Sequence, residues 1–393
     1  MMVRCKMQNM ISKDCILARR FDTAQAVRLT LADTSIFKVE DVDSAPENVW
    51  IAPALFDPQI NGFAGVDFQR EGLTLEELST AANGLRAAGC GQFFFTLTTD
   101  EWPVLLARLK HARALRAQST ELQSAIAGWH IEGPFLSAEP GYHGAHDPKL
   151  MLNPTAERIR ELRAAAGDDP LLITVAPERD GAIEAIELAA SLKIAVSLGH
   201  TDASAATLAA AVKAGATGFT HLGNGCTQAL DRHDNIILRV LETPGLCASV
   251  IPDAIHVSPA MFRLIHARTD RPDDSATVCY TTDAMSAAGA PPGRYRLGKI
   301  ELEVGADRVV RMPGRTNFAG SALRPVDGVF MAAKMLNCTW QDAWKCASLA
   351  TRRYAGLSVK QQGMPFCVLT VDGNEFKSGQ LYADGKKTEI LKS

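Results

Sequence analysis

The sequence predicts an α/β protein whose centre is a (β/α)₈ barrel. Eight short apolar runs end in polar or glycine-containing turns, and most are followed by a stretch with helical spacing. Such runs are typical of strands buried on both faces of a parallel sheet, and eight of them over roughly 300 residues favour a closed barrel. The runs cover residues 54–60, 92–98, 126–131, 171–176, 194–198, 217–222, 247–255 and 277–282.

An open, doubly wound sheet is the competing architecture. It would need a glycine-rich phosphate loop after an early strand, opening a helix. The early segment 61–65 (Asn-Gly-Phe-Ala-Gly) lacks the third glycine at the required spacing, and no obvious helix start follows it. The sequence therefore favours the barrel.

Two segments between the runs carry clear helix signals. Residues 74–77 read Thr-Leu-Glu-Glu, a capping box, and apolar residues on one face follow until Gly89. Ser258 and Pro259 place a capping residue before a proline in the first turn of a second helix. We expect helices to begin at these two points.

The two ends of the chain differ from its centre. Residues 1–52 and 356–393 alternate polar and apolar residues in short pieces, separated by turn signals such as Asp-Gly-Asn at 372–374. We expect the two ends to pair into one small β-sandwich domain. The barrel would then occupy residues 53–355.

Composition excludes several classes of protein. The chain has 393 residues, of which 47% are hydrophobic and 22% charged, so it can bury a large core. Its net charge of -3 disfavours nucleic acid as a partner. No secretory signal and no run long enough to span a bilayer are visible. Nine cysteines without a Cys-x-x-Cys pair indicate reduced thiols, so we expect a cytoplasmic protein without a membrane partner.

Polar side chains close most of the apolar runs, where barrel enzymes hold their working groups. Four of the nine histidines fall at or just past predicted strand ends. A single such histidine would usually be structural, but four together with carboxylates favour a chemical site. The polar residues in these places are Asp57, Gln59, Asn61, Thr98, Thr99, His130, Glu132, Glu178, His200, His221, Asn224, Asp253, His256 and Asp283.

Three of these residues have the composition of a metal site. Glu132, His200 and His221 lie on three different strands and offer one carboxylate and two imidazoles, which suits a divalent ion with a position left for water. Such an ion lowers the pKa of bound water, and a nearby carboxylate can then carry the proton. Asp283 is the candidate for that base, although it could instead cap the next helix.

Eight short motifs follow one another along the chain. They are DPQING at 57–62, HIEGP at 130–134, GAH at 144–146, GHT at 199–201, THLGN at 220–224, DAIHV at 253–257, TDAM at 282–285 and AGS at 319–321. Each motif is weak alone, but their order and spacing are specific. Together they resemble the N-acetylglucosamine-6-phosphate deacetylases of the amidohydrolase superfamily, over nearly the whole chain and including the split flanking domain.

The resemblance implies a role for each matching residue. Glu132, His200 and His221 would bind one divalent ion per subunit, zinc or alternatively iron, cobalt or manganese. Asp283 would be the general base and then the acid that protonates the leaving amine. His256 would contact the substrate and help to hold the reacting amide.

The same resemblance implies a phosphosugar subsite. Asn224 and the backbone of Gly225 would bind the sugar phosphate, with Arg232 and His146 near the phosphate. An arginine suits this role because its planar guanidinium pairs with phosphate through two hydrogen bonds. In family members such an arginine can come from a neighbouring subunit, so we expect a homodimer or homotetramer. The sequence leaves open whether His146 or the nearby His143 faces the substrate.

The first strand indicates a single metal ion. Many amidohydrolases carry His-x-His there, whereas this chain has Gln59 and Asn61, whose neutral amides are poor ligands for transition metals. The fourth run, 171–176, also contains no lysine that could bridge two ions. We count Gln59 and Asn61 as candidate substrate-binding residues instead.

The expected reaction is metal-dependent deacetylation of N-acetylglucosamine 6-phosphate to glucosamine 6-phosphate and acetate. One alternative is the same chemistry on N-acetylgalactosamine 6-phosphate or another N-acetyl sugar. A second is a catalytically silent barrel that binds a sugar phosphate. Cyclic-amide hydrolysis is disfavoured because the lysine and the His-x-His are both absent. The segment 224–228 (Asn-Gly-Cys-Thr-Gln) departs from the Asn-Ala-Met-Pro of many family members.

Overall fold

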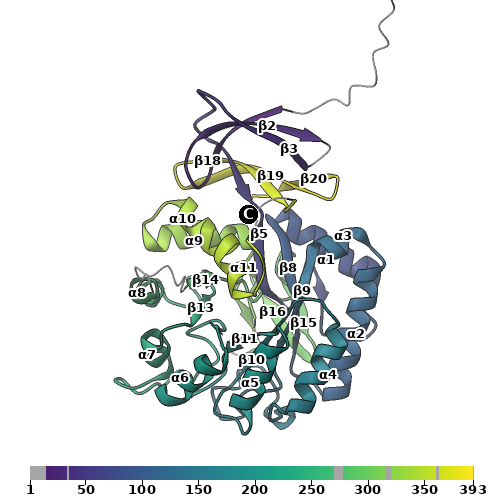
Figure 1. The fold of residues 1–393 in the computed structure, drawn as a ribbon, viewed down its shortest axis with the longest axis vertical. Coiled ribbons are helices and arrows are strands. Elements are labelled where there is room, and N and C mark those ends of the chain that lie inside the picture. The colour runs from purple at the N-terminus through teal and green to yellow at the C-terminus, as the bar shows by residue number, and fades with distance from the viewer. Residues whose placement is uncertain (1–14, 33–34, 270–277, 315–319, 360–362, 393) are drawn as a thin grey trace, which may run out of the picture.

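The computed structural model describes residues 15–32, 35–269, 278–314, 320–359 and 363–392, which form a barrel with a separate sheet at one end (Figure 1). Eight parallel strands pair in the order β14-β13-β12-β11-β10-β9-β8-β5, and Ile60 pairs with Ala284 to close the ring. The predicted barrel is confirmed. Its strands are β5 (Leu55–Ile60), β8 (Cys90–Thr98), β9 (Ile126–Glu132), β10 (Leu171–Val175), β11 (Ala195–Leu198), β12 (Gly218–Phe219), β13 (Cys247–Val250) and β14 (Val278–Tyr280).

Three strands are shorter by two or more residues than the apolar runs that predict them. The runs 217–222, 247–255 and 277–282 continue past the ends of β12, β13 and β14, and Thr277 lies outside the described residues. Beyond these strand ends, His221, Ala254 and Asp283 have φ values of 32°, 59° and 51°. A positive φ is incompatible with a β ladder, so apolar residues continue into the turns although strand pairing has ended.

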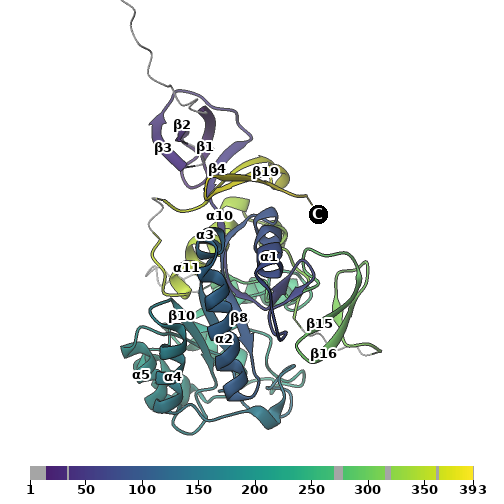
Figure 2. The ribbon, with the colours of Figure 1, turned by 90° about the vertical axis from the view of Figure 1, so that its right-hand side faces the viewer.

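The helices surround the barrel and cover the outer face of its strands (Figures 1 and 2). The capping box at Thr74 is present, and α1 buries Leu78 and Leu85 before Gly89 follows its end. Ser258 precedes α8 as expected, and its Oγ accepts a hydrogen bond from the backbone N of Met261. The α-helices are α1 (Leu75–Ala87), α2 (Trp102–Ala117), α3 (Thr120–Ala125), α4 (Ala156–Ala166), α5 (Ala182–Ser191), α6 (Ala205–Ala214), α7 (Ile236–Glu242), α8 (Pro259–Thr269), α9 (Pro325–Leu336), α10 (Trp340–Lys345) and α11 (Thr351–Tyr354).

Both ends of the chain form one seven-stranded sheet, which we call the terminal sheet. Its order is β20-β19-β18-β4-β1-β2-β3. Val27 and Leu29 from the N-terminal part cluster with Phe366 and Tyr382 from the C-terminal part, so the sheet folds on itself as a sandwich. Residues 1–14 of the predicted domain lie outside the described residues. Its strands are β1 (Cys15–Arg20), β2 (Ala26–Ala32), β3 (Ser35–Asp41), β4 (Val49–Pro53), β18 (Phe366–Asp372), β19 (Glu375–Ala383) and β20 (Lys386–Ile390).

The terminal sheet packs against the end of the barrel where the strands begin. The chain passes from β4 into β5 with one residue between them, and the backbone N of Leu391 donates to the carbonyl of Ala87 at the end of α1. The carboxyl ends of the barrel strands therefore lie on the face away from the terminal sheet.

A small three-stranded sheet follows β14, and nothing in the sequence patterns predicts it. Its strands are β15 (Gly293–Leu297), β16 (Ile300–Val304) and β17 (Val310–Arg311), and Figure 2 shows β15 and β16 beside the barrel. Leu302 packs with Met285 in a separate apolar cluster. A short hairpin of β6 (Gly62–Phe63) and β7 (Val66–Asp67) lies next to it, because Asp67 Oδ2 accepts a hydrogen bond from the backbone N of Gly298 at 2.7 Å.

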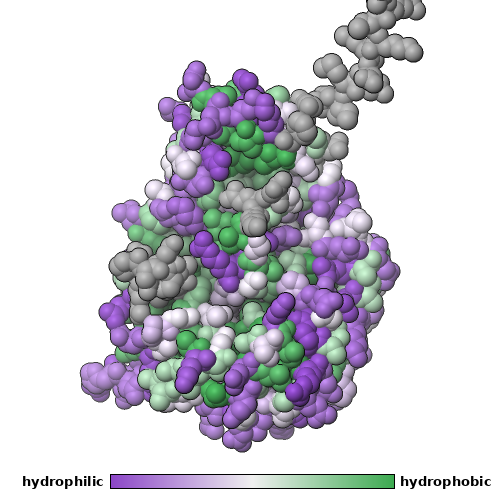
Figure 3. All heavy atoms as spheres, in the orientation of Figure 1, coloured by the Kyte–Doolittle hydropathy of each residue, from purple (hydrophilic) through white to green (hydrophobic). Residues whose placement is uncertain are grey.

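The surface carries polar and charged residues over much of the face seen in Figure 3. In the part of the chain that the structure describes, no helix is both long and apolar enough to cross a lipid bilayer. The cysteines of that part are all free thiols, as expected for scattered cysteines without a Cys-x-x-Cys pair.

Candidate active site

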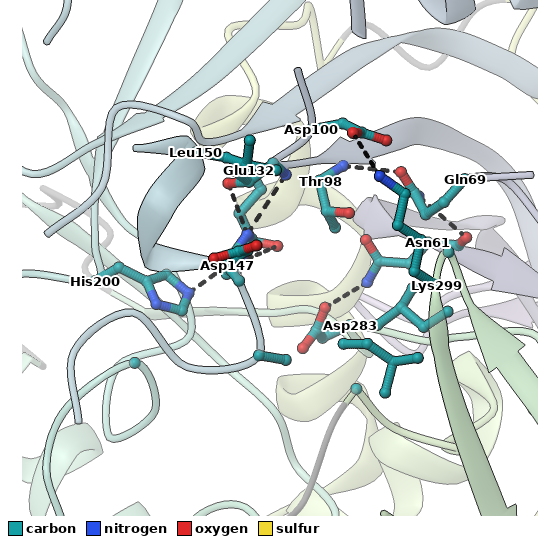
Figure 4. A pocket seen from close by; sticks show the side chains of 18 of the residues that line it. Asn61, Gln69, Thr98, Asp100, Glu132, Asp147, Leu150, His200, Asp283 and Lys299 are labelled. Carbon is teal, nitrogen blue, oxygen red and sulfur yellow. Dashed lines mark hydrogen bonds and ion pairs between the residues drawn. The ribbon is translucent and has the colours of Figure 1, made fainter. Parts of the chain in front are cut away.

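A pocket of about 370 Å³ opens at the carboxyl ends of the barrel strands (Figure 4). Polar side chains reach it from the ends of most barrel strands, which explains why residues far apart in the sequence meet there. Among them are Asn61 after β5, Glu132 at the end of β9, His200 after β11, His221 after β12 and Asp283 after β14. The side chains predicted from the strand ends are thus brought together.

The backbone turns sharply at three of these residues. His200, His221 and Asp283 have φ values of 52°, 32° and 51°, a region that non-glycine residues seldom adopt. Each such residue costs on the order of 1–3 kcal/mol and persists only where the surrounding structure enforces it. The left-handed turns coincide with the groups proposed to carry the chemistry.

Glu132, His200 and His221 form one buried cluster. Oε1 of Glu132 lies 2.8 Å from Nε2 of His221 and 3.4 Å from Nε2 of His200, and the three ligand atoms lie within 4.8 Å of one another. All three residues are at most 5% exposed. Burial raises the pKa of Glu132, but its contacts with His200 and His221 outweigh that effect and hold the pKa well below its usual range. The carboxylate is therefore ionised at neutral pH.

The donor set of this cluster fits a divalent metal ion. Nδ1 of His200 lies 2.7 Å from the carbonyl oxygen of Tyr142, which can only accept, so the proton of a neutral ring sits on Nδ1 and the Nε2 lone pair faces Glu132. One carboxylate and two imidazoles are a common set for first-row metals. Among the described residues, this is the one cluster of three or more such ligands that could hold an ion.

Asp283 lies beside the metal-site cluster and is held by two amides. Its Oδ1 accepts from Nδ2 of Asn61 at 2.6 Å and from Nε2 of Gln59 at 3.0 Å, while Gln59 also donates to Glu132 at 2.9 Å. Burial raises the pKa of Asp283 to about 7, with the charge of Glu132 adding to the effect. Such a carboxyl group both loses and regains a proton near neutral pH. Gln59 is buried beneath the pocket, whereas Asn61 lines it.

Two further histidines line the pocket. Nε2 of His146 lies 3.8 Å from Oε2 of Glu132, and Nδ1 of His146 pairs with Oγ1 of Thr99 at 2.8 Å. Burial lowers the pKa of His146 to about 3, so its ring is neutral at pH 7. His256 pairs with Asp253 through Nδ1 at 2.6 Å. Of the two candidates left open by the sequence, His146 faces the pocket, while His143 binds the carbonyl of His146.

The loop after β12 brings Asn224 and Gly225 to the pocket. A Cβ atom on Gly225 would lie 2.9 Å from Nδ1 of His200, and one on Gly144 would lie 2.9 Å from Cε1 of the same ring. Glycine at these two positions lets both loops approach His200 closely. Arg232, on the same loop, is exposed and does not line the pocket of this chain.

Comparison with known proteins gives a consistent result. N-acetylglucosamine-6-phosphate deacetylase of Bacillus subtilis (strain 168) is 30% identical over 316 residues, which cover 80% of this chain and 77% of the relative. The chain belongs to the N-acetylglucosamine-6-phosphate deacetylase family. An N-acetylgalactosamine-6-phosphate deacetylase from Escherichia coli O157:H7 is 28% identical over 84% of this chain and 85% of its own. No family model matches the chain.

Solved structures of the family have the same fold. An N-acetyl-D-glucosamine-6-phosphate deacetylase variant from Mycobacterium smegmatis, in complex with N-acetyl-D-glucosamine-6-phosphate, superposes with a TM-score of 0.80 at 27% identity. The match covers 95% of this chain and 99% of that one. A more distant aminohydrolase from Burkholderia multivorans, at 14% identity and a TM-score of 0.51, shares the fold alone.

Several pocket residues have no signal in the sequence. Gln69, Arg108 and Lys299 line the pocket, but they lie on a loop, a helix and a hairpin turn, not at strand ends. The choice of polar residues at strand ends also includes residues that do not line the pocket, such as Asp57. Asp57 accepts hydrogen bonds from Thr281 and Thr282, and so joins β5 to the segment after β14.

Proposed function

We propose that the protein hydrolyses the acetamide of N-acetylglucosamine 6-phosphate and releases acetate and glucosamine 6-phosphate. The observation that carries this proposal is the meeting of Glu132, His200 and His221 with Asp283 at one pocket. The names of the relatives support the substrate.

The metal of the proposal is one zinc ion per subunit, held by Glu132, His200 and His221. A zinc ion at this place supplies a Lewis acid that polarises a carbonyl oxygen and acidifies water. Zinc binds readily to a mixed set of nitrogen and oxygen ligands. Iron, cobalt and manganese accept the same ligands and are the alternatives. The amides of Gln59 and Asn61 donate to carboxylates and are committed there, which supports a single ion.

Asp283 is the proton carrier of the proposed reaction. Its carboxylate takes a proton from the attacking water and returns it to the nitrogen as the C–N bond breaks. A pKa of about 7 suits both steps, because the group then exchanges a proton near neutral pH with little loss of driving force. Gln59 and Asn61 hold Oδ1, which fixes the direction of the other carboxylate oxygen.

Both pocket histidines are assigned to the acetamide end of the substrate, which for His146 differs from the role near the phosphate that the resemblance implies. His146 lies beside Glu132 and is neutral, so we assign it to the acetyl oxygen and not to the phosphate. His256 is oriented by Asp253 and is assigned to hold the substrate at the reacting amide. A preorganised donor at the developing oxyanion lowers the barrier by several kcal/mol in related chemistry.

The phosphate is assigned to the loop after β12, with Asn224 and the backbone of Gly225. Arg232 completes this end in a homodimer or homotetramer, in which it reaches the pocket of a neighbouring subunit. Its exposure in the single chain is compatible with that arrangement. The free cysteines suit a reducing, cytoplasmic setting.

Acetate release tests the proposal directly. Purified protein loaded with zinc should release acetate from N-acetylglucosamine 6-phosphate and much less from N-acetylglucosamine, because binding of the remote phosphate aligns the amide. Metal analysis should give one ion per subunit. A zinc-loaded protein that binds the sugar phosphate but releases no acetate would contradict the proposal and favour the silent barrel.

N-acetylgalactosamine 6-phosphate is the second candidate substrate. The relative from Escherichia coli O157:H7 named for that substrate is nearly as similar to this chain as the first relatives are. Parallel measurement of kcat/KM on the two epimers decides between them. We expect the gluco epimer to have the higher value.

A further inference from the structure

The pocket has a second polar end, away from the metal-site cluster. Asp100, Arg108 and Lys299 all line it, and Figure 4 shows Asp100 and Lys299 on the opposite side of the pocket from His200. Oδ2 of Asp100 pairs with Nη1 of Arg108 at 2.6 Å, and Oδ1 lies 3.4 Å from Nζ of Lys299. We call these three residues the hairpin end. The proposed reaction uses none of them.

The hairpin end is built into the fold. Lys299 sits in the turn between β15 and β16, and Asp67 fixes this turn through the backbone N of Gly298. Ser286 Oγ donates to the carbonyl of Arg296 at 2.7 Å and anchors the preceding strand. Asp100 is only 8% exposed, whereas the side chain of Lys299 is 80% exposed. A buried acceptor is thus fixed opposite a solvated ammonium group.

The sheet order places the hairpin end across the barrel from the proposed phosphate loop. Asp100 follows β8, and the loop with Asn224 and Gly225 follows β12. In the closed ring, β8 and β12 are separated by β9, β10 and β11 on one side and by β5, β14 and β13 on the other. They therefore lie on opposite sides of the barrel mouth.

The chemistry of the substrate determines which of its groups faces the hairpin end. In a hexosamine 6-phosphate, the carbon that carries the acetamide is opposite the ring carbon that carries the phosphate arm. With the acetamide at the metal-site cluster and the phosphate at the loop after β12, the carbons next to the acetamide carbon would belong to the half of the ring away from the phosphate, the half nearer β8. These carbons carry the hydroxyls O1 and O3.

We propose that Lys299 and Asp100 bind a sugar hydroxyl on a carbon adjacent to the acetamide carbon, with Arg108 holding Asp100 in place. A hydroxyl both donates and accepts, so it can donate to the carboxylate and accept from the ammonium group. This subsite makes the enzyme selective for sugars in which that hydroxyl is free. The inference rests on the proposed function, because it takes the substrate to be an N-acetylhexosamine 6-phosphate.

Substrate analogues combined with one substitution test the subsite. The full-length, zinc-loaded protein and its Lys299→Met variant are assayed for acetate release from N-acetylglucosamine 6-phosphate, its 3-deoxy analogue and its 1,5-anhydro analogue. Methionine keeps most of the apolar length of an 80% exposed side chain, so folding is little affected. Lys213→Met, an exposed lysine of α6 that does not line the pocket, is the matched control.

The expected result is weaker binding of substrate, seen as a higher KM, that depends on one sugar hydroxyl. Lys299→Met should raise KM for the parent substrate about tenfold, the size expected for a hydrogen bond to a charged group, with kcat within about twofold. With the unchanged protein, the analogue that lacks the bound hydroxyl should have a KM about tenfold above that of the parent substrate. For that analogue, Lys299→Met should cause no further rise in KM. Lys213→Met should match the unchanged protein on all three substrates.

Two results would overturn the subsite. One is a Lys299→Met variant that equals the unchanged protein on the parent substrate. The other is an equal loss on the parent and on both deoxy analogues, which would show an effect unrelated to either hydroxyl. If the unchanged protein released no acetate from the parent substrate, the proposed function would fail instead, so the two failures are distinguishable.

Discussion

Two layers of polar residues occupy the barrel, and they differ in whether their polar groups are satisfied within the protein. The inner layer is a closed hydrogen-bonded network: His130 Nε2 pairs with Thr174 Oγ1 at 2.8 Å, Thr174 with Thr220 at 2.9 Å, and both Thr220 and Tyr354 donate to Ser197. The outer layer, two residues further along β9, is the cluster of Glu132 at the pocket. His130 and Glu132 thus lie on one strand and differ only in depth.

The difference teaches how depth decides the role of a polar side chain. In the inner layer, burial lowers the pKa of His130 to about 4, and its neighbours are neutral hydroxyls that satisfy the ring. In the outer layer, a carboxylate and two imidazoles crowd one point, and Nδ1 of His221 is buried without a hydrogen-bond partner in the described structure. The inner layer is complete without a ligand, whereas the outer layer is suited to hold one.

The largest expected effect belongs to Asp283. Asp283→Asn should lower kcat for acetate release by about 1,000-fold or more, because the amide cannot carry the proton, while the metal content stays at one ion per subunit. Acetate release and metal analysis of the same sample measure the two quantities. Asp169→Asn, in an ion-pair network with Arg113 and Arg116 away from the pocket, serves as the control. Near-normal turnover of Asp283→Asn would refute its role as base.

A smaller effect is expected for metal affinity. Glu132→Gln should weaken zinc binding by at least about 100-fold, because it removes the one anionic ligand from the cluster. His130→Gln, on the same strand but in the inner layer, should keep its zinc. Competition with a chelator gives the two affinities. Equal zinc affinity in both variants would contradict the claim that the outer layer, and not the inner layer, binds the metal.

The pH dependence of stability should separate the layers further. The pKa of His130 in the folded protein, about 4, lies below the ordinary histidine value of 6.5, so the unfolded chain takes up the proton first as pH falls. The contribution of the neutral His130 ring to the free energy of unfolding is fully present above pH 6.5. It should fall by about 3 kcal/mol between pH 6.5 and pH 4. Urea unfolding of the protein and of His130→Gln across this range isolates the effect as a difference. A difference that does not change with pH would contradict it.

The smallest effect is expected at the edge of the inner layer. Tyr354→Phe removes the hydrogen bond to Ser197, which is 2.7 Å long and fully buried, and should lower the free energy of unfolding by about 1–2 kcal/mol. Turnover should stay within about twofold, because the inner layer touches no substrate. Thermal unfolding and acetate release measure the two. A large loss of turnover without a loss of stability would place Tyr354 in the chemistry.

The sequence predicts the barrel and most of the pocket for a clear physical reason. Parallel strands are buried on both faces, so their apolar runs are visible, and their carboxyl ends must meet at one face. The rule finds Glu132, His200, His221 and Asp283. It cannot separate His130 from Glu132, because residues two positions apart on one strand point to the same side and the sequence does not show how deep each one lies.

The hairpin end shows where sequence reasoning stops. Lys299 is one of many exposed lysines, and only the hydrogen bond from Gly298 to Asp67 brings its turn to the pocket. Such a placement depends on contacts between segments more than 200 residues apart, which no local pattern records. The role of Arg232 remains a prediction, because its proposed contact is with the pocket of a second copy of the chain.

The shared terminal sheet has a consequence for the order in which the molecule forms during synthesis. Strand β4 pairs with β1 on one edge and with β18 on the other, and β18 leaves the ribosome only after the whole barrel has been made. Until then, one edge of β4 has no neighbour. A nascent chain halted just before β18 would therefore expose an open strand edge beside a finished barrel, and such an edge can pair with another copy of the chain.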